Sequence, residues 1–265
     1  MTFSLVDKIF DFHKHACCIC GADIFDDKGF CEHCIQKIPF NNGKTCKYCG
    51  AVVLGDNDCC STCRADKTFF DKAISSFDYV GHMQSLIKNF KYANKRYLAE
   101  IFANYMAATL MASGLQVDCV VAVPLSEKSL AKRGYNQSLL LAQKVCKLTN
   151  LPLIENNLIK IKDTDQQEKL SFKQRRENLL DAFKVTDKTA FVGKNVLIID
   201  DVKTTGTTLS RIAKVLKLSK ANKVYGLTAV SVKENIRNQA SDKLKGKKHI
   251  NKKTIRTVTR RQIDE

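Results

Sequence analysis

The sequence predicts an α/β domain with a mostly parallel sheet, preceded by a small zinc-ribbon module and followed by a basic tail. Three observations support this. From Thr68 to Val232, apolar runs alternate with amphipathic stretches. Ten of the twelve cysteines lie between Cys17 and Cys63. The last segment, Lys233 to Glu265, lacks Phe, Tyr and Trp and carries 11 basic and 4 acidic residues. We therefore divide the chain into 1–66, 67–232 and 233–265.

Composition narrows the class of protein. The chain has 265 residues, a formal charge of +17 and a 44% hydrophobic share, which is enough for a packed core. No apolar run approaches the ~18 residues of a membrane helix. Charged residues interrupt the N-terminal stretch where a signal peptide would be apolar. We expect a soluble cytoplasmic protein. The basic surplus favours polyanionic partners, although a Lys-rich surface that serves only solubility is the alternative.

The cysteines form four C-x-x-C pairs, and this spacing lets two thiolates from one tight turn bind the same ion. Two such turns complete a tetrahedral site, so eight ligands predict two zinc ions. We pair neighbours, although spacing alone also allows an interleaved arrangement. The predicted ligands are Cys17, Cys20, Cys31 and Cys34 in one site, and Cys46, Cys49, Cys60 and Cys63 in the other.

Some ligand positions remain open. Cys18 could replace Cys17, Cys59 could replace Cys60, and His15 and His33 are spare ligands. A disulfide framework does not suit a cytosolic chain. Sites closed by four thiolates leave no open coordination position, so we expect structural zinc, with docking of nucleic acid or protein as the alternative role. The two isolated cysteines, Cys119 and Cys146, are expected to be buried apolar residues.

The α/β region begins with a strand and a long helix. Ala73 to Tyr79 is expected as a strand and His82 to Leu115 as one helix with an apolar stripe. Further strands are expected at Cys119 to Val123, Asn195 to Ile199 and Lys223 to Val230, with a short extended piece at Leu153 to Ile159. Ser138 to Leu148 is expected as a helix. Alternation of this kind predicts helices on both faces of the sheet.

The sharpest motif is the fourteen-residue stretch from Val196 to Leu209, VLIIDDVKTTGTTL. An apolar strand delivers Asp200 and Asp201 to the carboxyl edge of the sheet, where ligands of α/β proteins bind. A loop of small residues then leads into a helix, whose N-terminus is a ready anion site. The loop, which should cradle a phosphate, comprises Thr204, Thr205, Gly206, Thr207 and Thr208. The two carboxylates suit ribose hydroxyls or a hydrated Mg²⁺.

Other phosphate-binding motifs do not match. A Walker A loop ending at Gly193-Lys194 would need glycine at position 188 and Ser or Thr at position 195, which are Lys188 and Asn195. The chain contains no G-x-G sequence, so the dinucleotide fingerprint is absent. The plainer interpretation of the stretch is a strand, turn and helix rich in capping residues. Paired aspartates beside five small residues argue against it.

The fourteen-residue stretch resembles the phosphoribosyl-pyrophosphate (PRPP) motif of type I phosphoribosyltransferases. Together with other segments and the double zinc ribbon, it makes roughly residues 15 to 232 similar to the ComF family. The matching segments are Phe90-Lys91-Tyr92, Val123-Pro124-Leu125, Arg133-Gly134-Tyr135-Asn136-Gln137, and the series Thr164, Gln167, Leu170, Arg175, Asn178 and Ala182-Phe183. The basic tail lies outside the resemblance.

The resemblance implies a role for each matching position. Asp200 and Asp201 would bind the ribose hydroxyls of PRPP, directly or through Mg²⁺, and the threonine-rich loop would hold its 5′-phosphate. The turn at Leu125, Ser126 and Glu127 takes the place of the family's pyrophosphate loop. Candidate countercharges for pyrophosphate are Lys91, Arg133 and Arg175, although each could equally be a solvated surface charge. The segment Asp163 to Asn178 takes the place of a loop over the ligand.

Three functions follow from the resemblance. The first is transfer of phosphoribose to an unidentified base in nucleotide metabolism, by displacement of pyrophosphate at the anomeric carbon. The second is handling of internalised single-stranded DNA during natural transformation, with competence proteins as possible partners and the PRPP pocket as a sensor or grip. The third is a non-catalytic scaffold organised by zinc. We favour a PRPP-binding domain acting in DNA uptake and leave catalysis open.

Single-stranded DNA could stack on Tyr92, Tyr97 and Tyr135, although half-buried packing is the other interpretation of these tyrosines. The basic tail is expected to be a flexible or partly helical extension, with a nonspecific grip on nucleic acid or membrane as its functional alternative.

Overall fold

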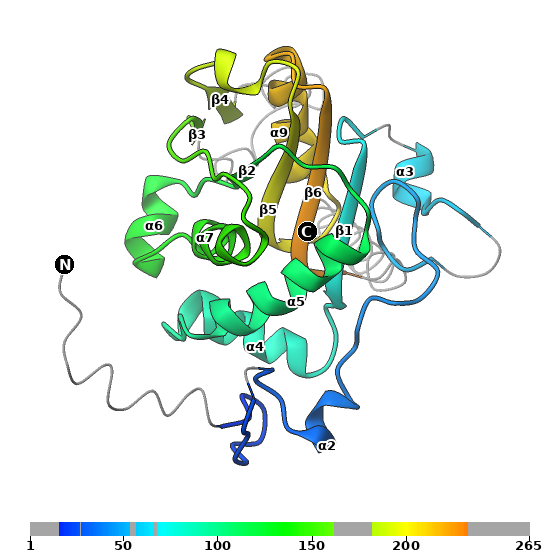
Figure 1. Cartoon of the computed structure of the whole chain (residues 1–265), viewed down its shortest axis with the longest axis vertical. Coiled ribbons are helices and arrows are strands. Elements are labelled where there is room, and N and C mark those ends of the chain that lie inside the picture. Colours follow the sequence, from blue (N-terminus) through cyan, green and yellow to red (C-terminus); the bar gives the residue numbers. More distant parts are fainter. Residues whose placement is uncertain (1–15, 27, 54–56, 66–67, 162–181, 233–265) are drawn as a thin grey trace, which may run out of the picture.

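The computed structural model describes residues 16–26, 28–53, 57–65, 68–161 and 182–232. At its centre lies a four-stranded sheet in the order β1-β6-β5-β2, and every pair of neighbours is parallel. Because the strands are parallel, their carboxyl ends share one edge of the sheet, which Figure 1 shows among the surrounding helices. The strands are β1 (Lys72–Asp78), β2 (Cys119–Ala122), β5 (Asn195–Lys203) and β6 (Lys223–Ser231).

Helices cover both faces of this sheet, as predicted (Figure 1). One face packs against α4 (His82–Tyr92), α5 (Leu98–Ala112) and α7 (Gln137–Thr149), and the other against α9 (Thr207–Leu218). Strand β5 serves both: Leu197 and Ile199 belong to the first core, and Val196 and Ile198 to the second. A strand buried on both sides needs an unbroken apolar run, which is why the sequence located it. Among the described helices, none has the length and apolar character needed to span a bilayer.

The single helix expected from His82 to Leu115 was wrong, because the structure has two helices there. Helix α4 ends at Tyr92 and α5 begins at Leu98. Between them Asn94 adopts a left-handed backbone, with φ of 53°. The hydroxyl of Tyr135 donates a hydrogen bond to the carbonyl of Phe90, which a continuing helix would use internally. A residue 45 positions away therefore helps to end α4.

Several short elements complete the α/β region. The extended piece expected at Leu153 to Ile159 is mostly loop: Leu153 forms one parallel bridge with Val120, and strand β3 begins only at Leu158. Strands β3 and β4 pair antiparallel in a separate two-stranded sheet. Helix α6 and strand β4 have no counterpart among the elements predicted from the sequence. These elements are β3 (Leu158–Lys160), β4 (Phe183–Val185), α6 (Glu127–Arg133) and the 3-10 helix η4 (Thr189–Phe191).

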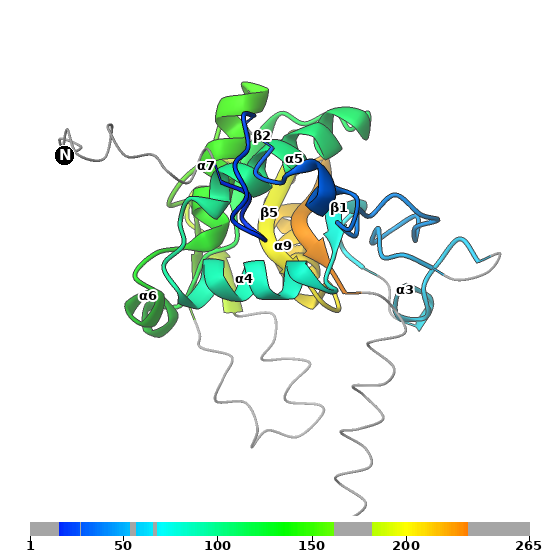
Figure 2. The same cartoon turned by 90° about the horizontal axis from the view of Figure 1, so that it is seen from below.

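The two cysteine-rich turns before β1 pack in different places. The first, with the short helix α2 (Glu32–Ile35), lies beside α5 (Figure 2). There the rings of Phe30 and Tyr105 are 5.7 Å apart, and the Tyr105 hydroxyl donates a 3.2 Å hydrogen bond to the carbonyl of Lys28. The first turn is thus attached to the helical layer.

The second turn, with α3 (Ser61–Ala65), lies along the outer edge of β1. The amide of Ala73 in β1 donates a 2.7 Å hydrogen bond to the carbonyl of Tyr48. Cys46, Cys49 and Cys60 belong to the same apolar cluster as the buried face of α9. The module therefore covers what would otherwise be a free sheet edge.

Candidate functional site

Two adjacent carboxylates lie at the carboxyl end of β5. Asp201 is only 5% exposed, and its Oδ1 lies 2.9 Å from the ammonium of Lys91 at the end of α4. The apolar strand brings the carboxylates to the sheet edge, and the end of α4 brings the lysine to them. Because both side chains are largely shielded from water, solvent screens the attraction between their charges only in part.

Asp200 is held by polar contacts from two sides. Its Oδ1 accepts a 2.8 Å hydrogen bond from the hydroxyl of Ser138 in α7 and a 2.9 Å bond from the amide of Asp201. Burial raises the pKa of the Asp200 carboxyl to about 7, and the charge of Asp201 acts in the same direction, whereas Ser138 and Lys91 oppose the shift. The Asp200 carboxyl is therefore close to half protonated at neutral pH.

The small-residue loop between β5 and α9 has the shape of an anion cradle. Gly206 caps α9 with a left-handed backbone, φ of 79°, that other residues adopt only at a cost. The hydroxyls of Thr205 and Thr207 are 2.7 Å apart, and Thr204 and Thr208 are exposed with them. Amides at the start of a twelve-residue helix point toward this loop, so its chemistry suits phosphate.

The end of the neighbouring strand β2 contributes a second turn. Leu125 is partly buried, Ser126 caps α6 by accepting a hydrogen bond from the amide of Ser129, and Glu127 is exposed in the first turn. The side chain of Asn136 donates a 3.0 Å hydrogen bond to the carbonyl of Val123 and also caps α7. Asn136 thus ties the end of β2 to the start of the helix that carries Ser138.

Arg133, the last residue of α6, forms a cation–π pair with Tyr92. The guanidinium of Arg133 lies 5.3 Å from the ring centre of Tyr92 and donates a 3.1 Å hydrogen bond to the side chain of Gln137. Tyr92 is 62% exposed. The third predicted countercharge, Arg175, lies outside the described residues, as do Thr164, Gln167, Leu170 and Asn178 and the segment Asp163 to Asn178.

The other two tyrosines considered for stacking are packed rather than free. Tyr135 is 9% exposed, with Arg96 stacked 4.6 Å from its ring centre. Tyr97 is half-buried, and burial raises the pKa of its phenol. Of the three tyrosines, only Tyr92 presents an open ring.

The structure brings Lys91, Asp200 and Asp201 into one cluster and places the threonine-rich loop directly after it. Sequence reasoning missed Ser138, the residue that reaches Asp200 from α7. Ser138 directly follows the segment Arg133 to Gln137, which is one of the segments that resemble the ComF family. A serine in the first turn of a helix beside that segment is the signal that could have found it.

The eight predicted cysteine ligands lie in two tetrads, and within each all sulfur atoms are within 4.8 Å of one another. Each tetrad could therefore hold one zinc ion. The first comprises Cys17, Cys20, Cys31 and Cys34, and the second Cys46, Cys49, Cys60 and Cys63. Four clustered thiols are the ligand set of structural zinc. The neighbouring-pair grouping is the one the chain adopts.

The spare candidates stand outside the tetrads. Cys18 and Cys59 pack at the edges of the two apolar clusters, and His33 forms a 2.8 Å hydrogen bond with Lys37. His15 lies outside the described residues. All twelve cysteines are free, and Cys119 and Cys146 are buried as expected.

Electrostatics connect the second tetrad to the end of β5. A hydrogen bond with the Cys63 thiol lowers the pKa of Cys49 to about 4, and the charge of Lys203 contributes in the same direction. Lys203 is 2% exposed and is the last residue of β5, immediately before the threonine-rich loop.

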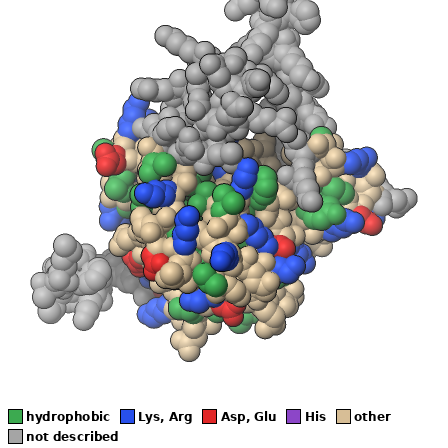
Figure 3. Space-filling model, turned by 90° about the horizontal axis from the view of Figure 1, so that it is seen from above, with side chains coloured by type: hydrophobic (Ala, Val, Ile, Leu, Met, Phe, Trp, Pro, Cys, Tyr) green, Lys and Arg blue, Asp and Glu red, His purple; other side chains and the backbone are tan. Residues whose placement is uncertain are grey.

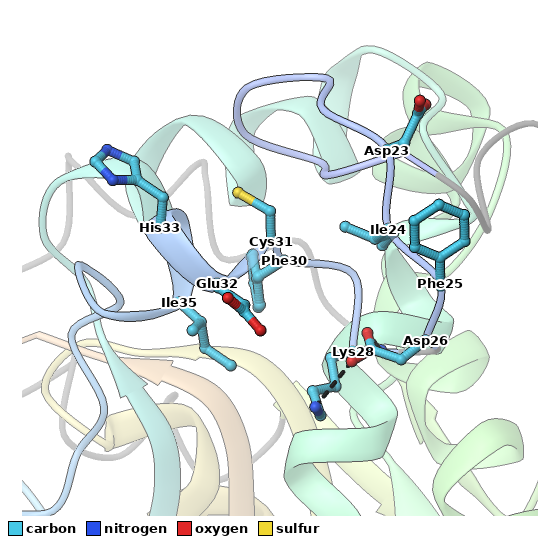
Figure 4. Close-up of a pocket in the computed structure, with 10 residues that line it drawn as sticks. All are labelled: Asp23, Ile24, Phe25, Asp26, Lys28, Phe30, Cys31, Glu32, His33 and Ile35. Atoms are coloured by element: carbon cyan, nitrogen blue, oxygen red, sulfur yellow. Dashed lines mark hydrogen bonds and ion pairs between the residues drawn. The ribbon is translucent and has the colours of Figure 1, made fainter.

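Two surface features lie away from this edge. A groove of about 710 Å³ in the first cysteine-rich turn is lined in part by Asp26, Lys28 and Glu32, with an ion pair between Asp26 and Lys28 (Figure 4). Its lining mixes charged and apolar groups, and it lies apart from β5. Figure 3 views the end of the molecule opposite to that in Figure 2, and Lys and Arg side chains recur across it. The basic surplus is thus not confined to the candidate site.

The known proteins that this chain resembles include several named for competence or for DNA utilization. The chain is 30% identical to "Competence protein F" of Haemophilus influenzae, over 78% of this chain and 93% of that protein. It is 27% identical to "Competence protein ComFC" of Bacillus subtilis, over 82% and 95% of the two chains. It is 26% identical to "DNA utilization protein YhgH" of Escherichia coli, over 71% and 84%. No protein-family model matches the chain.

Similar solved structures include glutamine PRPP amidotransferase from B. subtilis, at 22% identity and a TM-score of 0.35, over 48% of this chain and 25% of that one. A purine phosphoribosyltransferase from Pyrococcus horikoshii is 15% identical with a TM-score of 0.32, over 51% of this chain and 73% of that one.

Proposed function

Because the chain belongs to the ComF family of competence-associated proteins, we propose that it binds PRPP or a related phosphoribosyl ligand and handles single-stranded DNA during natural transformation. The relationship to Competence protein F covers nearly the whole length of that protein, so the family's defining parts are all expected here. The names of the relatives suggest the role in transformation, and the residues at the edge of β5 suggest the ligand.

The observation that carries the ligand proposal is the Asp200–Asp201 pair at the end of β5, followed without interruption by the loop at the N-terminus of α9. The loop would hold the 5′-phosphate through backbone amides and threonine hydroxyls. The carboxylates would take the ribose hydroxyls, directly or through Mg²⁺, whose preferred ligands are oxygen atoms. A ligand with both groups spans the two parts of this site.

Cations beside the carboxylates suit the rest of PRPP. Lys91 already lies at the pair, and Arg133 is the last residue of α6, the helix that begins in the turn at Leu125 to Glu127. Pyrophosphate bound near that turn would be neutralised by these side chains and by Mg²⁺. Asp200 would lose its proton when the metal arrives, because a divalent cation favours the ionised carboxylate.

Single-stranded DNA would use the neighbouring Tyr92. An exposed ring with a guanidinium beside it offers stacking for a base and a contact for a phosphate. Tyr135 and Tyr97 would not stack on the strand, because both are packed.

The family relationship also suggests competence proteins as partners. We place the activity in the cytoplasm, because free thiols gathered as metal ligands belong in a reducing compartment.

A second candidate function, transfer of phosphoribose to a base, is favoured by Lys91 and Arg133 at the end of the site where a leaving pyrophosphate would lie. The bond between the anomeric carbon and the pyrophosphate oxygen would break, and a nitrogen of the base would form the new bond. The protein would act by positioning the groups and by neutralising the leaving charge. A scaffold without a ligand fits less well, because two adjacent carboxylates are kept at the cost of a raised pKa at Asp200.

The test is calorimetric titration of the full chain with PRPP and Mg²⁺. Saturable, Mg²⁺-dependent binding is expected for the wild type and for Glu155→Gln, which removes an exposed carboxylate elsewhere. Binding should be lost in Asp201→Asn. Release of pyrophosphate with one of a panel of bases would add catalysis. No binding to the wild type would defeat the ligand proposal.

A further inference from the structure

The segment that joins the second cysteine tetrad to β1 runs across the beginning of α9. The backbone amide of Phe69 donates a 3.1 Å hydrogen bond to the hydroxyl of Ser210, and the ammonium of Lys214 lies 4.9 Å from the Phe69 ring centre. Both partners are in the first turns of α9. The linking segment is therefore fastened to the helix that follows the threonine-rich loop.

Phe70 fills the space beneath the loop itself. Its side chain is 3% exposed, and its ring lies 3.6 Å from the position that a Cβ on Gly206 would occupy. Gly206 has the left-handed backbone that turns the chain into α9. The phenylalanine ring thus forms the wall against which that turn rests, and packing of this kind holds a loop in one conformation.

The second tetrad belongs to the same apolar cluster as this contact. Cys46, Cys49 and Cys60 are at most 1% exposed and share one apolar cluster with Phe70 and with Leu209 of α9. Close backbone contacts reinforce the cluster: a Cβ on Gly50 would lie 2.3 Å from the carbonyl oxygen of Ala73. The tetrad, Phe70 and the loop are therefore one packed unit.

The first tetrad is separate from this unit. Cys17 and Cys34 form a small cluster of their own with Ile24, and the surrounding turn rests on α5 through Phe30 and Tyr105. Nothing in these contacts reaches α9 among the described residues. The chain thus provides its own comparison between two sites of the same ligand chemistry.

We propose that the second tetrad, when it holds zinc, is a positioning element for the phosphate loop and acts through Phe70. Short cysteine-rich turns owe their folding energy to the bound metal, so loss of zinc at this site would unfold the segment around residues 46–63. Phe70 would lose its support, and the turn at Gly206 would sample other conformations. Loss of zinc at the first tetrad would leave the loop unchanged.

The test is amide hydrogen exchange of the full chain, followed by mass spectrometry of peptides that cover residues 204–210. Cys46→Ser is expected to raise exchange there at least about tenfold, whereas Cys17→Ser, the matching position in the first tetrad, leaves it unchanged. Exchange in peptides from β6, a buried strand of the central sheet, shows whether each variant is folded as a whole. Equal exchange in the two variants at residues 204–210 would overturn the proposal.

Phe70→Leu decides the case if Cys46→Ser does not fold. It should retain both zinc ions and still raise exchange in the loop, because the smaller side chain leaves Gly206 unsupported. Unchanged exchange in this variant would also overturn the proposal. Hydrogen exchange is measured without ligand, so its result tests this proposal independently of whether the protein binds PRPP. If the wild type does bind PRPP, Cys46→Ser should weaken that affinity more than Cys17→Ser does.

Discussion

The ammonium of Lys91 lies 2.9 Å from Oδ1 of Asp201, which joins the last turn of α4 to the carboxyl end of β5. The two side chains are 18% and 7% exposed, so water screens their charges only in part. The pair does two things at once. It neutralises one member of an adjacent aspartate pair and, under the proposed function, it keeps a cation ready for the pyrophosphate of the ligand.

Replacing Lys91 tests the first role. Lys91→Met keeps the apolar stem but leaves Asp201 without its cation, and we expect a loss of about 1–3 kcal/mol in the free energy of unfolding at pH 7.5. The double variant Lys91→Met/Asp201→Asn should lose less than the sum of the single variants. Urea denaturation measures both. Lys88→Met, an exposed lysine on the same helix, is the control and should change little. Strict additivity would show that the pair contributes nothing.

The raised pKa of Asp200 predicts a pH dependence of ligand binding. Only the ionised carboxylate binds Mg²⁺ well, so affinity for PRPP with Mg²⁺ should rise as the pH increases through about 7. The folded-state pKa lies above the unfolded value of 3.8, so this group's contribution to stability is fully present below 3.8 and is lost as the pH rises through about 7. Ligand-free protein should therefore lose stability over the range in which it gains affinity.

Ser138→Ala separates this effect from the titration of the ligand. The serine hydroxyl lowers the pKa of Asp200, so its removal should move the midpoint of the affinity profile to higher pH. The ligand's own titration is the same in both proteins. Calorimetric titrations from about pH 6 to about pH 8.5 measure the affinity profiles of both proteins. This range extends about one pH unit or more on each side of the expected midpoint. Coincident midpoints would contradict the assignment to Asp200.

The main sheet could be predicted from the sequence because each of its strands is buried on both faces or nearly so. Asn195 to Ile199 and Lys223 to Val230 are apolar runs with helical stretches between them, and they became β5 and β6. The unbroken apolar sequence of such a run indicates by itself that the strand is buried on both faces. The family resemblance rests on the same local patterns.

What the sequence did not predict depends on distant partners. The end of α4 is set partly by Tyr135, whose hydroxyl takes the carbonyl of Phe90. Strand β4 is three residues long and exists because β3 pairs with it. Ser138 reaches Asp200 across 62 positions. Local patterns alone do not fix these contacts, because each depends on how the sheet and helices are assembled.

Zinc stoichiometry will decide which cysteines are ligands. Wild-type protein, Cys18→Ser and Cys59→Ser should each carry two zinc ions per chain, because these two thiols lie outside the tetrads. Cys17→Ser and Cys60→Ser should each carry one. Metal analysis of the purified proteins measures the content. Loss of one zinc from Cys18→Ser, with none lost from Cys17→Ser, would reverse the assignment in the first site.

Tyr92 should matter for single-stranded DNA and not for folding. Tyr92→Ala removes an exposed ring and should weaken binding of an oligonucleotide by about 1–3 kcal/mol per stacked base. Tyr135→Phe removes a buried hydroxyl that bonds to Phe90, so it should lower thermal stability and change DNA affinity little. Fluorescence anisotropy at fixed salt measures affinity. A stronger DNA defect in Tyr135→Phe than in a stable Tyr92→Ala would place the strand elsewhere.

Gly206→Ala tests the anion cradle through the backbone alone. A Cβ at this position would meet the Phe70 ring at 3.6 Å, which is ordinary contact, so the left-handed φ of 79° decides the cost. We expect a loss of about 1 kcal/mol in stability and a much larger loss of affinity for PRPP with Mg²⁺, because the amides that face the phosphate would be turned away. Gly193→Ala is the matched control: its φ is 71° and a Cβ there meets nothing within 4 Å, so it should have the same cost in stability and retain ligand affinity. Thermal unfolding and calorimetric titration of both variants measure the two quantities. Equal affinity in the two variants would mean that the loop before α9 does not hold the phosphate.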